Sequence, residues 1–360
     1  MKEIKLQILA LLKAGPMNPS KVAERVGISR QATHRHLKAL LKDNRIEKQG
    51  LIPHVFYTLA SLNRESRVQE SMLFFNEHFL ANCLKQDQVN KAYELFCSEQ
   101  AAPRSGKPDF AFMLDAAAVY SSNIEGNSLN LNSFLNSRMQ AKKIRPKEAQ
   151  EIEDLVEAYL FSQNHGLNEK NMLRTHAILS KGFISKGRQG VYRMEPIGVF
   201  SDHGLEYLAV EPQFVNHEMY ELFKVVSQLL TSRILPMEVF FWASWLHLMI
   251  VLIHPFSDGN GRIARLCEKW FLVRKLGTQM VFLSSEEYYF KERPNYYSAL
   301  RLGANYWEAD FSLSMPFLKL LPQVLLNRGA HAPAKPATFA FPQTHGTVYD
   351  LPGWRGNSVI

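Results

Sequence analysis

The sequence predicts a mainly helical protein with a small basic domain at its start and a larger helical domain behind it. Apolar residues recur at helical spacing over much of the chain from about 109 to 326. Glycine and β-forming residues interrupt that pattern at about 187–210, which predicts a β-hairpin there. The first sixty residues carry eleven Lys or Arg against four Asp or Glu, so they hold +7 of the net charge of +8.

The composition is typical of a globular protein. With 360 residues, 46% of them hydrophobic, the chain can bury one large core and one small one. Cys83, Cys97 and Cys267 lie far apart and match neither a disulfide framework nor a zinc spacing, so we expect a reducing, cytoplasmic location. The longest apolar run, 239–253, includes His247 and is too short for a membrane span, so we expect no membrane partner.

Residues 1–60 are predicted to form three short helices followed by two short strands. The run "IKLQILALL" has helical periodicity, and "GPMNPS" ends that helix and places Asn18 or Ser20 to cap the second one. Ser29 is placed to cap the third helix, "RQATHRHLKALLKDN". The strand-like runs "RIEKQG" and "HVFYTL" follow.

This order of elements resembles a winged helix-turn-helix domain, whose third helix enters the major groove of DNA. The resemblance implies DNA as a partner, and a homodimer is a further expectation because such domains often read their sites in pairs. The alternative is a solvated basic helix in a protein-interaction or dimerisation module. If DNA is bound, the contacts would come from the outward side chains of the third helix: Arg30, Gln31, Thr33 and His34 toward base edges, and Arg35 and Lys38 toward phosphates.

The rest of the chain divides into a helical linker region, a large helical domain and a tail. We expect the linker at 61–108, the large domain at 109–326 and a flexible, proline-containing tail at 327–360. The large domain should open with a helix at about 109–126, capped by Asp109. Further helices are predicted at 146–163, 169–180, 212–231, 236–253, 261–276, 293–302 and 311–325.

The stretch "HPFSDGNGRIAR", His254 to Arg265, combines groups that suit a phosphate site. A helix that begins at "GNGR" would direct its first backbone N–H groups toward an anion, and glycines allow close approach. Asp258 is placed to hold Mg²⁺ together with phosphate oxygens, and His254 can accept a proton near neutral pH. A Walker loop is absent. The stretch therefore predicts a nucleotide phosphate site with a base beside it.

The same stretch resembles the signature of the Fic family, H-x-F-x-[DE]-G-N-G-R-x-x-R, at every defined position. The resemblance implies a mainly helical fold and a protein adenylyltransferase, which moves AMP from ATP to a Ser, Thr or Tyr hydroxyl of a target protein or of itself. The implied roles are His254 as general base, Phe256 as loop anchor, Asp258 as Mg²⁺ ligand, Gly259, Asn260, Gly261 and Arg262 around the phosphates, and Arg265 on the γ-phosphate.

Two further features match the family. The predicted hairpin at about 187–210 resembles the flap, which pairs with an extended target segment by strand addition. Tyr296 and Tyr297 resemble an aromatic pair, one of which flanks the adenine, although core packing is an equal alternative. We expect a structural role for His247.

The segment "SSNIEG" resembles the family's inhibitory motif, [ST]-x-x-x-E-[GN], with Ser121, Glu125 and Gly126 at its defined positions. Glu125 could form a bidentate ion pair with Arg265 and so remove the group that holds the γ-phosphate. Glu125 could instead orient a water for AMP removal, as in bifunctional relatives.

Other functions remain open at this point. The second domain could sense nucleotides for a transcription regulator, or it could transfer another group such as UMP, phosphate or phosphocholine. The intact His254 and Asp258 argue against a pure sensor, because a sensor needs no base.

Overall fold

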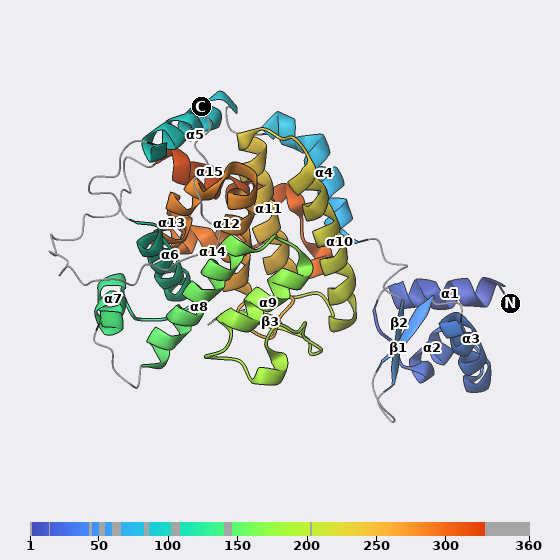
Figure 1. Ribbon diagram of the computed structural model, residues 1–360. Coiled ribbons are helices and arrows are strands. Elements are labelled where there is room, and N and C mark those ends of the chain that lie inside the picture. Colours follow the sequence, from blue (N-terminus) through green and yellow to red (C-terminus); the bar gives the residue numbers. More distant parts are fainter. Residues whose placement is uncertain are drawn as a thin grey trace. The chain divides into compact units, whose positions relative to one another are not determined.

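The computed structural model describes residues 2–13, 15–42, 45–49, 55–59, 66–82, 86–101, 109–139, 146–201 and 204–327. These residues are mainly helical, which confirms the predicted fold class, and Figure 1 shows a small N-terminal domain and a large helical body. The tail predicted at 327–360 lies outside the described residues from 328 onward.

The N-terminal domain has the predicted order of elements. These are α1 (Lys2–Lys13), α2 (Pro19–Val26), α3 (Arg30–Lys42), β1 (Ile46–Gln49) and β2 (Phe56–Leu59). Asn18 caps α2 by accepting a hydrogen bond from the backbone of Lys21, and Ser29 does the same for α3. The two strands pair antiparallel. A small core holds the domain together: Ile8, Leu12, Met17, Val22, Leu37, Leu40, Ile46 and Tyr57.

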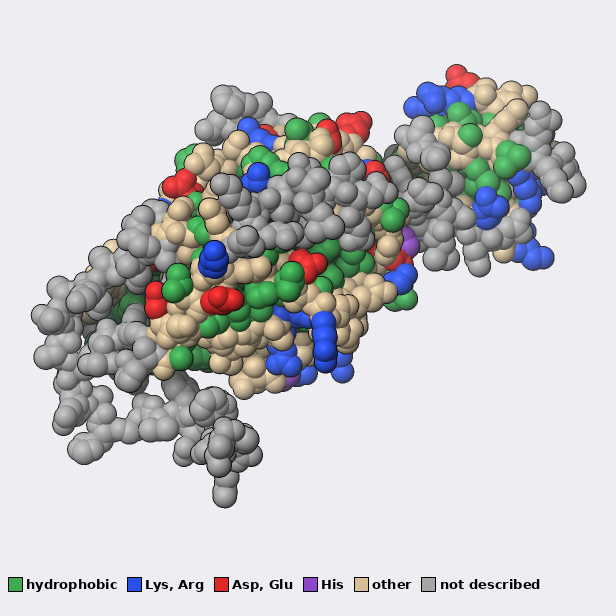
Figure 2. Space-filling model, turned by 90° about the horizontal axis from the view of Figure 1, so that it is seen from above, with side chains coloured by type: hydrophobic (Ala, Val, Ile, Leu, Met, Phe, Trp, Pro, Cys, Tyr) green, Lys and Arg blue, Asp and Glu red, His purple; other side chains and the backbone are tan. Residues whose placement is uncertain are grey.

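The outer face of α3 carries most of the predicted DNA contacts. Arg30, Gln31, His34, Arg35 and Lys38 are all exposed. Figure 2 shows Lys and Arg side chains at several places on the surface of this domain.

Thr33 corrects the prediction for this helix. Its side chain is fully buried, and its hydroxyl donates to the carbonyl of Ser29 at 3.0 Å. A threonine hydroxyl bonded back to the preceding turn is satisfied inside the domain, so the prediction that Thr33 faces DNA is wrong.

The large body is built around α11 (Pro236–Ile253), a helix that is apolar on every side. By length and composition α11 could cross a membrane, but most of it is buried inside this body, which is typical of a central core helix. It packs against α12 (Asn260–Leu276), α10 (Pro212–Thr231), α5 (Gln86–Ala101) and α15 (Met315–Leu326). Figure 1 shows α11 and α12 near the middle of the body.

Several of the remaining helices of this body pack against α12. α6 (Phe110–Ile124) begins at the predicted cap Asp109, whose carboxylate accepts from the backbone of Phe112. The short helices α7 and α13 were not predicted, since their sequences carry too few turns for a periodic pattern. The bounds are α4 (Arg67–Asn82), α7 (Leu131–Met139), α8 (Lys147–Asn164), α9 (Glu169–Leu179), η2 (Lys186–Arg188), η3 (Thr278–Phe282), α13 (Ser285–Lys291), α14 (Arg293–Ala299), η4 (Tyr306–Glu308) and η5 (Phe311–Ser314).

The helices in the region expected as a linker contribute to the main core. Val68 and Phe75 of α4, and Val89 and Phe96 of α5, are buried in the same apolar cluster as α11. Glu218 of α10 accepts hydrogen bonds from Ser66 and from the backbone of Val68, so α10 caps the start of α4. These two helices therefore belong structurally to the large body.

The hairpin occupies only the second half of its predicted range. β3 (Gly198–Ser201) pairs antiparallel with β4 (Gly204–Leu208), with an irregularity between Val199 and Phe200. The preceding residues, 187–197, form the end of η2 and an irregular segment. This segment contacts the chain just after α11, where the backbone N–H of Arg193 donates to the carbonyl of Pro255.

Candidate active site

The motif 254–265 forms a sharp corner between α11 and α12. His254 follows α11 with φ 53° and ψ 59°, and among the described residues it is the one non-glycine with positive φ. Such a conformation costs a residue with a Cβ about 1–3 kcal/mol, so the surroundings must hold it. Part of the support is local, because the Asn260 side chain accepts from Phe256 N at 2.9 Å and donates to Phe256 O at 2.8 Å.

The chemical state of His254 suits a base. Nδ1 lies 3.2 Å from the carbonyl of Val251, and since a carbonyl only accepts, Nδ1 carries the proton and Nε2 keeps its lone pair. Desolvation lowers the pKa of His254 below its ordinary value, with Arg193 adding to the effect and Glu125 and Asp258 opposing it. The imidazole is therefore neutral at pH 7.

The N-terminus of α12 can serve as an anion site, and a carboxylate lies over it. The helix starts at Asn260, so the first backbone N–H groups have no acceptor within the helix. A Cβ at Gly261 would collide with Oε1 of Glu125, which places that oxygen directly over the first turn. The side chain of Asn260 is occupied by the loop itself, so only its backbone can face an anion.

Arg265 is buried, and it donates to Ser121 of α6 and to Glu125, the residue after α6. Nε donates to Ser121 Oγ at 2.9 Å, and Nη2 donates to Ser121 O at 3.0 Å and to Glu125 Oε1 at 2.6 Å. The ion pair with Glu125 thus has one hydrogen bond, and the bidentate geometry predicted for it is wrong, because Ser121 and Tyr296 accept from the other donors. Gly126 follows with φ 97°, a conformation that favours glycine.

The surrounding positive charges stabilise the ionised form of Glu125. Desolvation opposes its ionisation, but Arg265, with help from Arg262 and His254, lowers the pKa of Glu125 below its usual value. The carboxylate is therefore ionised at pH 7 and acts as an internal anion for the site.

Arg262 and Asp258 line the other side of the corner. The Arg262 guanidinium lies 3.7 Å from the ring centroid of Phe183 and 3.4 Å from Asp258 Oδ1. Its Nε is buried with no hydrogen-bond partner. The Asp258 side chain is 59% exposed and also accepts from Gly259 N. An exposed carboxylate beside an incompletely satisfied guanidinium suits a phosphate with Mg²⁺.

A buried polar chain supports Arg265 from behind. Its Nη1 donates to the Tyr296 hydroxyl at 3.2 Å, and that hydroxyl lies 3.0 Å from His247 Nε2. His247 Nδ1 in turn lies 2.8 Å from the Glu268 carboxylate. His247 is fully buried, in agreement with the structural role expected for it.

The two tyrosines differ in position. Tyr296 is 1% exposed, so packing excludes it from flanking an adenine, and the core alternative holds for this residue. Tyr297 is 38% exposed, and its hydroxyl donates to the carbonyl of Ile124, next to Glu125.

His176 is a site residue that the sequence reasoning missed. It is buried, stacks on Phe256 with ring centroids 3.5 Å apart, and donates from Nε2 to the carbonyl of Asp258 at 2.9 Å. Nδ1 accepts from the backbone of Gly190 at 3.0 Å. Burial lowers the pKa of His176 to about 4. The available signal was its place on the apolar face of α9, between Met172 and Leu179.

We expect His176→Phe to destabilise the large body by about 2 kcal/mol or more. Phenylalanine can keep the stack on Phe256 but leaves the Asp258 carbonyl and the Gly190 N–H without partners, at about 1–3 kcal/mol for each buried group. Urea denaturation followed by tryptophan fluorescence measures the change. His165→Phe is the matched control, because His165 also stacks on a phenylalanine but is only half-buried. Equal stability of the two variants would contradict the role given to His176.

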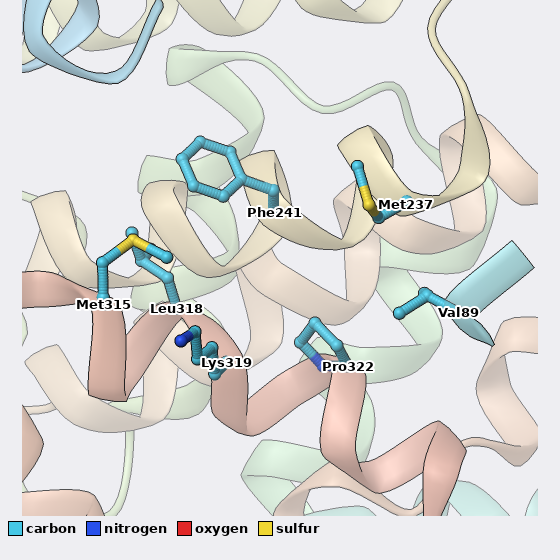
Figure 3. A pocket seen from close by; sticks show the side chains of 7 residues that line it. All are labelled: Val89, Met237, Phe241, Met315, Leu318, Lys319 and Pro322. Carbon is cyan, nitrogen blue, oxygen red and sulfur yellow. The ribbon is translucent and has the colours of Figure 1, made fainter. Parts of the chain in front are cut away.

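A small apolar cavity lies away from this corner. Its volume is about 20 Å³, and its lining comes from α5, α11 and α15 (Figure 3). A space of this size holds at most one water, and the apolar lining gives a water few partners, so the cavity is a packing defect. The lining residues are Val89, Met237, Phe241, Met315, Leu318, Lys319 and Pro322.

Comparisons with known proteins connect this geometry to a family. A model of the Fic/DOC family matches residues 166–272, which include His254–Arg265, and a model described as winged helix-turn-helix DNA-binding matches residues 1–47. Glu125 lies outside both matches.

The chain also resembles solved structures of Fic proteins. A Fic family protein from Desulfovibrio desulfuricans G20 is 20% identical, with a TM-score of 0.56 over 68% of this chain and 72% of that chain. A Fic domain containing signaling protein from Bacteroides thetaiotaomicron VPI-5482 is also 20% identical, with a TM-score of 0.52 over 67% of this chain and 93% of that chain. At this identity the likeness demonstrates a shared fold.

Proposed function

Since the chain is a Fic/DOC domain protein with an N-terminal winged helix-turn-helix domain, we propose that it is a protein adenylyltransferase. It moves AMP from ATP to a Ser, Thr or Tyr hydroxyl of a target protein or of itself. The observation that supports this most is the corner at 254–265, where a neutral histidine adjoins a helix N-terminus and two arginines.

The proposed step is a displacement at the α-phosphorus of ATP. The target hydroxyl oxygen bonds to that phosphorus while Nε2 of His254 takes its proton. The bond to the oxygen bridging the α- and β-phosphates breaks, and pyrophosphate leaves with the electron pair. The α12 N–H groups, Arg262 and Arg265 stabilise the negative charge of the phosphates, so the protein acts mainly by orientation and electrostatics.

Asp258 is the residue that would hold Mg²⁺ in this proposal. Magnesium prefers one or two carboxylates together with substrate oxygens, and Asp258 offers an exposed carboxylate beside the anion site. When bound, the ion would neutralise part of the charge on the phosphates.

The target segment is proposed to add to the outer edge of β3. The last residue of β4 already has a backbone partner on its other side, because Leu208 N donates to the carbonyl of Ala304 at 2.9 Å. Within the described residues β3 has β4 as its one strand partner, so its other edge can pair with an extended peptide. Val191, Met194 and Val199 are exposed apolar side chains in and before β3 that could contact such a peptide.

Glu125 is proposed as a built-in inhibitor of the reaction. Its carboxylate lies over the α12 N-terminus and pairs with Arg265, so it competes with a nucleotide phosphate for both groups. A phosphate can bind productively only when this carboxylate leaves.

The donor is tested by supplying purified Glu125→Gly protein with Mg²⁺ and ATP labelled on either the α- or the γ-phosphate. We expect label on protein from the α-phosphate alone. Label from the γ-phosphate alone would show that the reaction is phosphoryl transfer and not nucleotidyl transfer. If ATP binds but leaves no label on protein, the protein either uses another donor or senses nucleotides as a regulator. Labelled UTP and CDP-choline separate these two, because label from either one would identify another donor.

DNA binding is proposed for the N-terminal domain. Five polar or basic side chains of α3 are exposed on one helix, and the domain carries most of the net positive charge. Phosphate contacts would position the domain, and Arg30, Gln31 and His34 would reach base edges.

We expect Arg35→Ala/Lys38→Ala to weaken DNA binding and to lower the salt dependence of the binding constant. Each lost phosphate contact lowers the steepness of the plot of log K against log salt concentration by about 0.9. The slope for the double variant should therefore be less steep by about 2. A salt series of gel shifts, with fragments from upstream of the protein's own coding sequence, measures this. Lys147→Ala/Lys170→Ala in the large body is the control. Absence of any shift for the parent protein at low salt would leave a protein-interaction role instead.

A further inference from the structure

A buried arginine next to the flap lies outside the motif at 254–265. Arg193 is 3% exposed and precedes β3 in the sequence. Its guanidinium donates to four backbone carbonyls, and its own backbone N–H donates to the carbonyl of Pro255 at 3.0 Å. The four bonds are Nε to His254 O (2.6 Å), Nη1 to Glu195 O (2.8 Å), Nη2 to Val210 O (2.5 Å) and Nη2 to Ile253 O (3.2 Å).

On one side, Arg193 caps the C-terminus of α11. The last carbonyls of a helix have no partner within it, and a positive charge there also interacts favourably with the helix dipole. Two of these carbonyls, on Ile253 and His254, accept from Arg193. The direction of the His254 carbonyl is set by ψ of His254, so a bond to this oxygen restrains the left-handed conformation of that residue.

On the other side, Arg193 holds both ends of the flap. Glu195 precedes β3 and Val210 follows β4, and their carbonyls bond to the same guanidinium. A backbone hydrogen bond also closes the base of the hairpin, since Ala209 N donates to Ile197 O at 3.0 Å. One side chain therefore joins the flap to the backbone of His254.

We propose that Arg193 is a positioning residue, which fixes the strained backbone of His254 and couples it to the flap. The proposal rests on the proposed function to the extent that His254 is the base. The planar guanidinium presents five donors in a fixed fork, whereas a lysine ammonium is a compact point charge. Arg193→Lys thus keeps the positive charge but cannot bond at the same time to the carbonyls at the end of α11 and to those at the two ends of the flap.

The test compares Arg193→Lys with its parent in the Glu125→Gly background. We expect kcat for transfer from ATP to fall roughly a hundredfold, because a small displacement of a base is costly. KM for ATP should stay within about twofold, because Arg193 has no contact with the α12 N-terminus or its arginines. Arg174→Lys, an exposed arginine on α9, is the control and should match the parent.

Hydrogen exchange gives a readout that needs no activity. The amide of His254 donates to Ile250 O at 2.9 Å, and in Arg193→Lys we expect peptides covering 251–256 to exchange roughly tenfold faster. Peptides covering 236–248 should be unchanged.

The outcomes separate the two proposals. If the parent transfers nothing, the proposed function fails, and the exchange result still decides the role of Arg193. A higher KM for ATP with kcat unchanged would overturn the positioning role, and so would unchanged exchange at 251–256. Faster exchange throughout α11 would overturn it as well, in favour of a general folding role.

Discussion

Replacing His254 by alanine is expected to lower AMP transfer by roughly a hundredfold to ten-thousandfold, the range typical of a lost general base. The reason is the state of this imidazole: neutral, with Nδ1 bonded to the Val251 carbonyl and Nε2 left to accept a proton. The measurement is the initial rate of protein labelling from α-labelled ATP, in the Glu125→Gly background. ATP affinity should change little, because the phosphates are assigned to α12 and its arginines.

His165→Ala is the matched control for this prediction. His165 also follows the last residue of a helix, α8, and its Nδ1 also lies near a backbone carbonyl, that of Phe161 at 2.8 Å. It lies outside the motif, so its loss should leave the rate within about twofold. A His254→Ala variant that keeps more than a tenth of the parent rate would show that another group removes the proton.

Replacing Glu125 by glycine is expected to raise AMP transfer by roughly tenfold to a hundredfold. The variant removes one charge-assisted hydrogen bond to Arg265, about 1.5–3 kcal/mol, which a nucleotide phosphate must otherwise displace. It also clears the space over Gly261, at the first turn of α12. The measurement compares labelling by wild type and variant at one ATP concentration.

Glu148→Gly supplies the control for charge and helix effects, because Glu148 is an exposed glutamate in the first turn of α8. It should label at the wild-type rate. Equal labelling by Glu125→Gly and wild type would refute the inhibitory role. Release of AMP from labelled protein by wild type but not by Glu125→Gly would assign Glu125 to AMP removal instead.

Much of the fold could be predicted because its signals are local. The caps at Asn18, Ser29 and Asp109 lie where the sequence placed them, and the prolines at 212 and 236 start their helices. The motif at 254–265 was also predictable, because its own Asn260 closes the loop through contacts four residues apart.

The orientation of single side chains was less predictable. Thr33 was expected to face DNA but is buried, since its hydroxyl can be satisfied by the preceding turn. Tyr296 was a candidate for the nucleotide but fills the core, where its hydroxyl meets His247 and Arg265. Both outcomes depend on which polar groups find a partner inside the domain, and periodicity alone does not reveal this.

The sequence by itself determined the mainly helical class, the basic N-terminal domain and the contiguous set of groups from His254 to Arg265. Only the tertiary structure decided what surrounds that set: Glu125 over α12, His176 on the carbonyl of Asp258, and Arg193 on the carbonyl of His254. The physical reason is the range of the contacts. Residues within one turn of each other meet whenever the local backbone forms, whereas residues 60 to 140 positions apart meet only when the helices have packed.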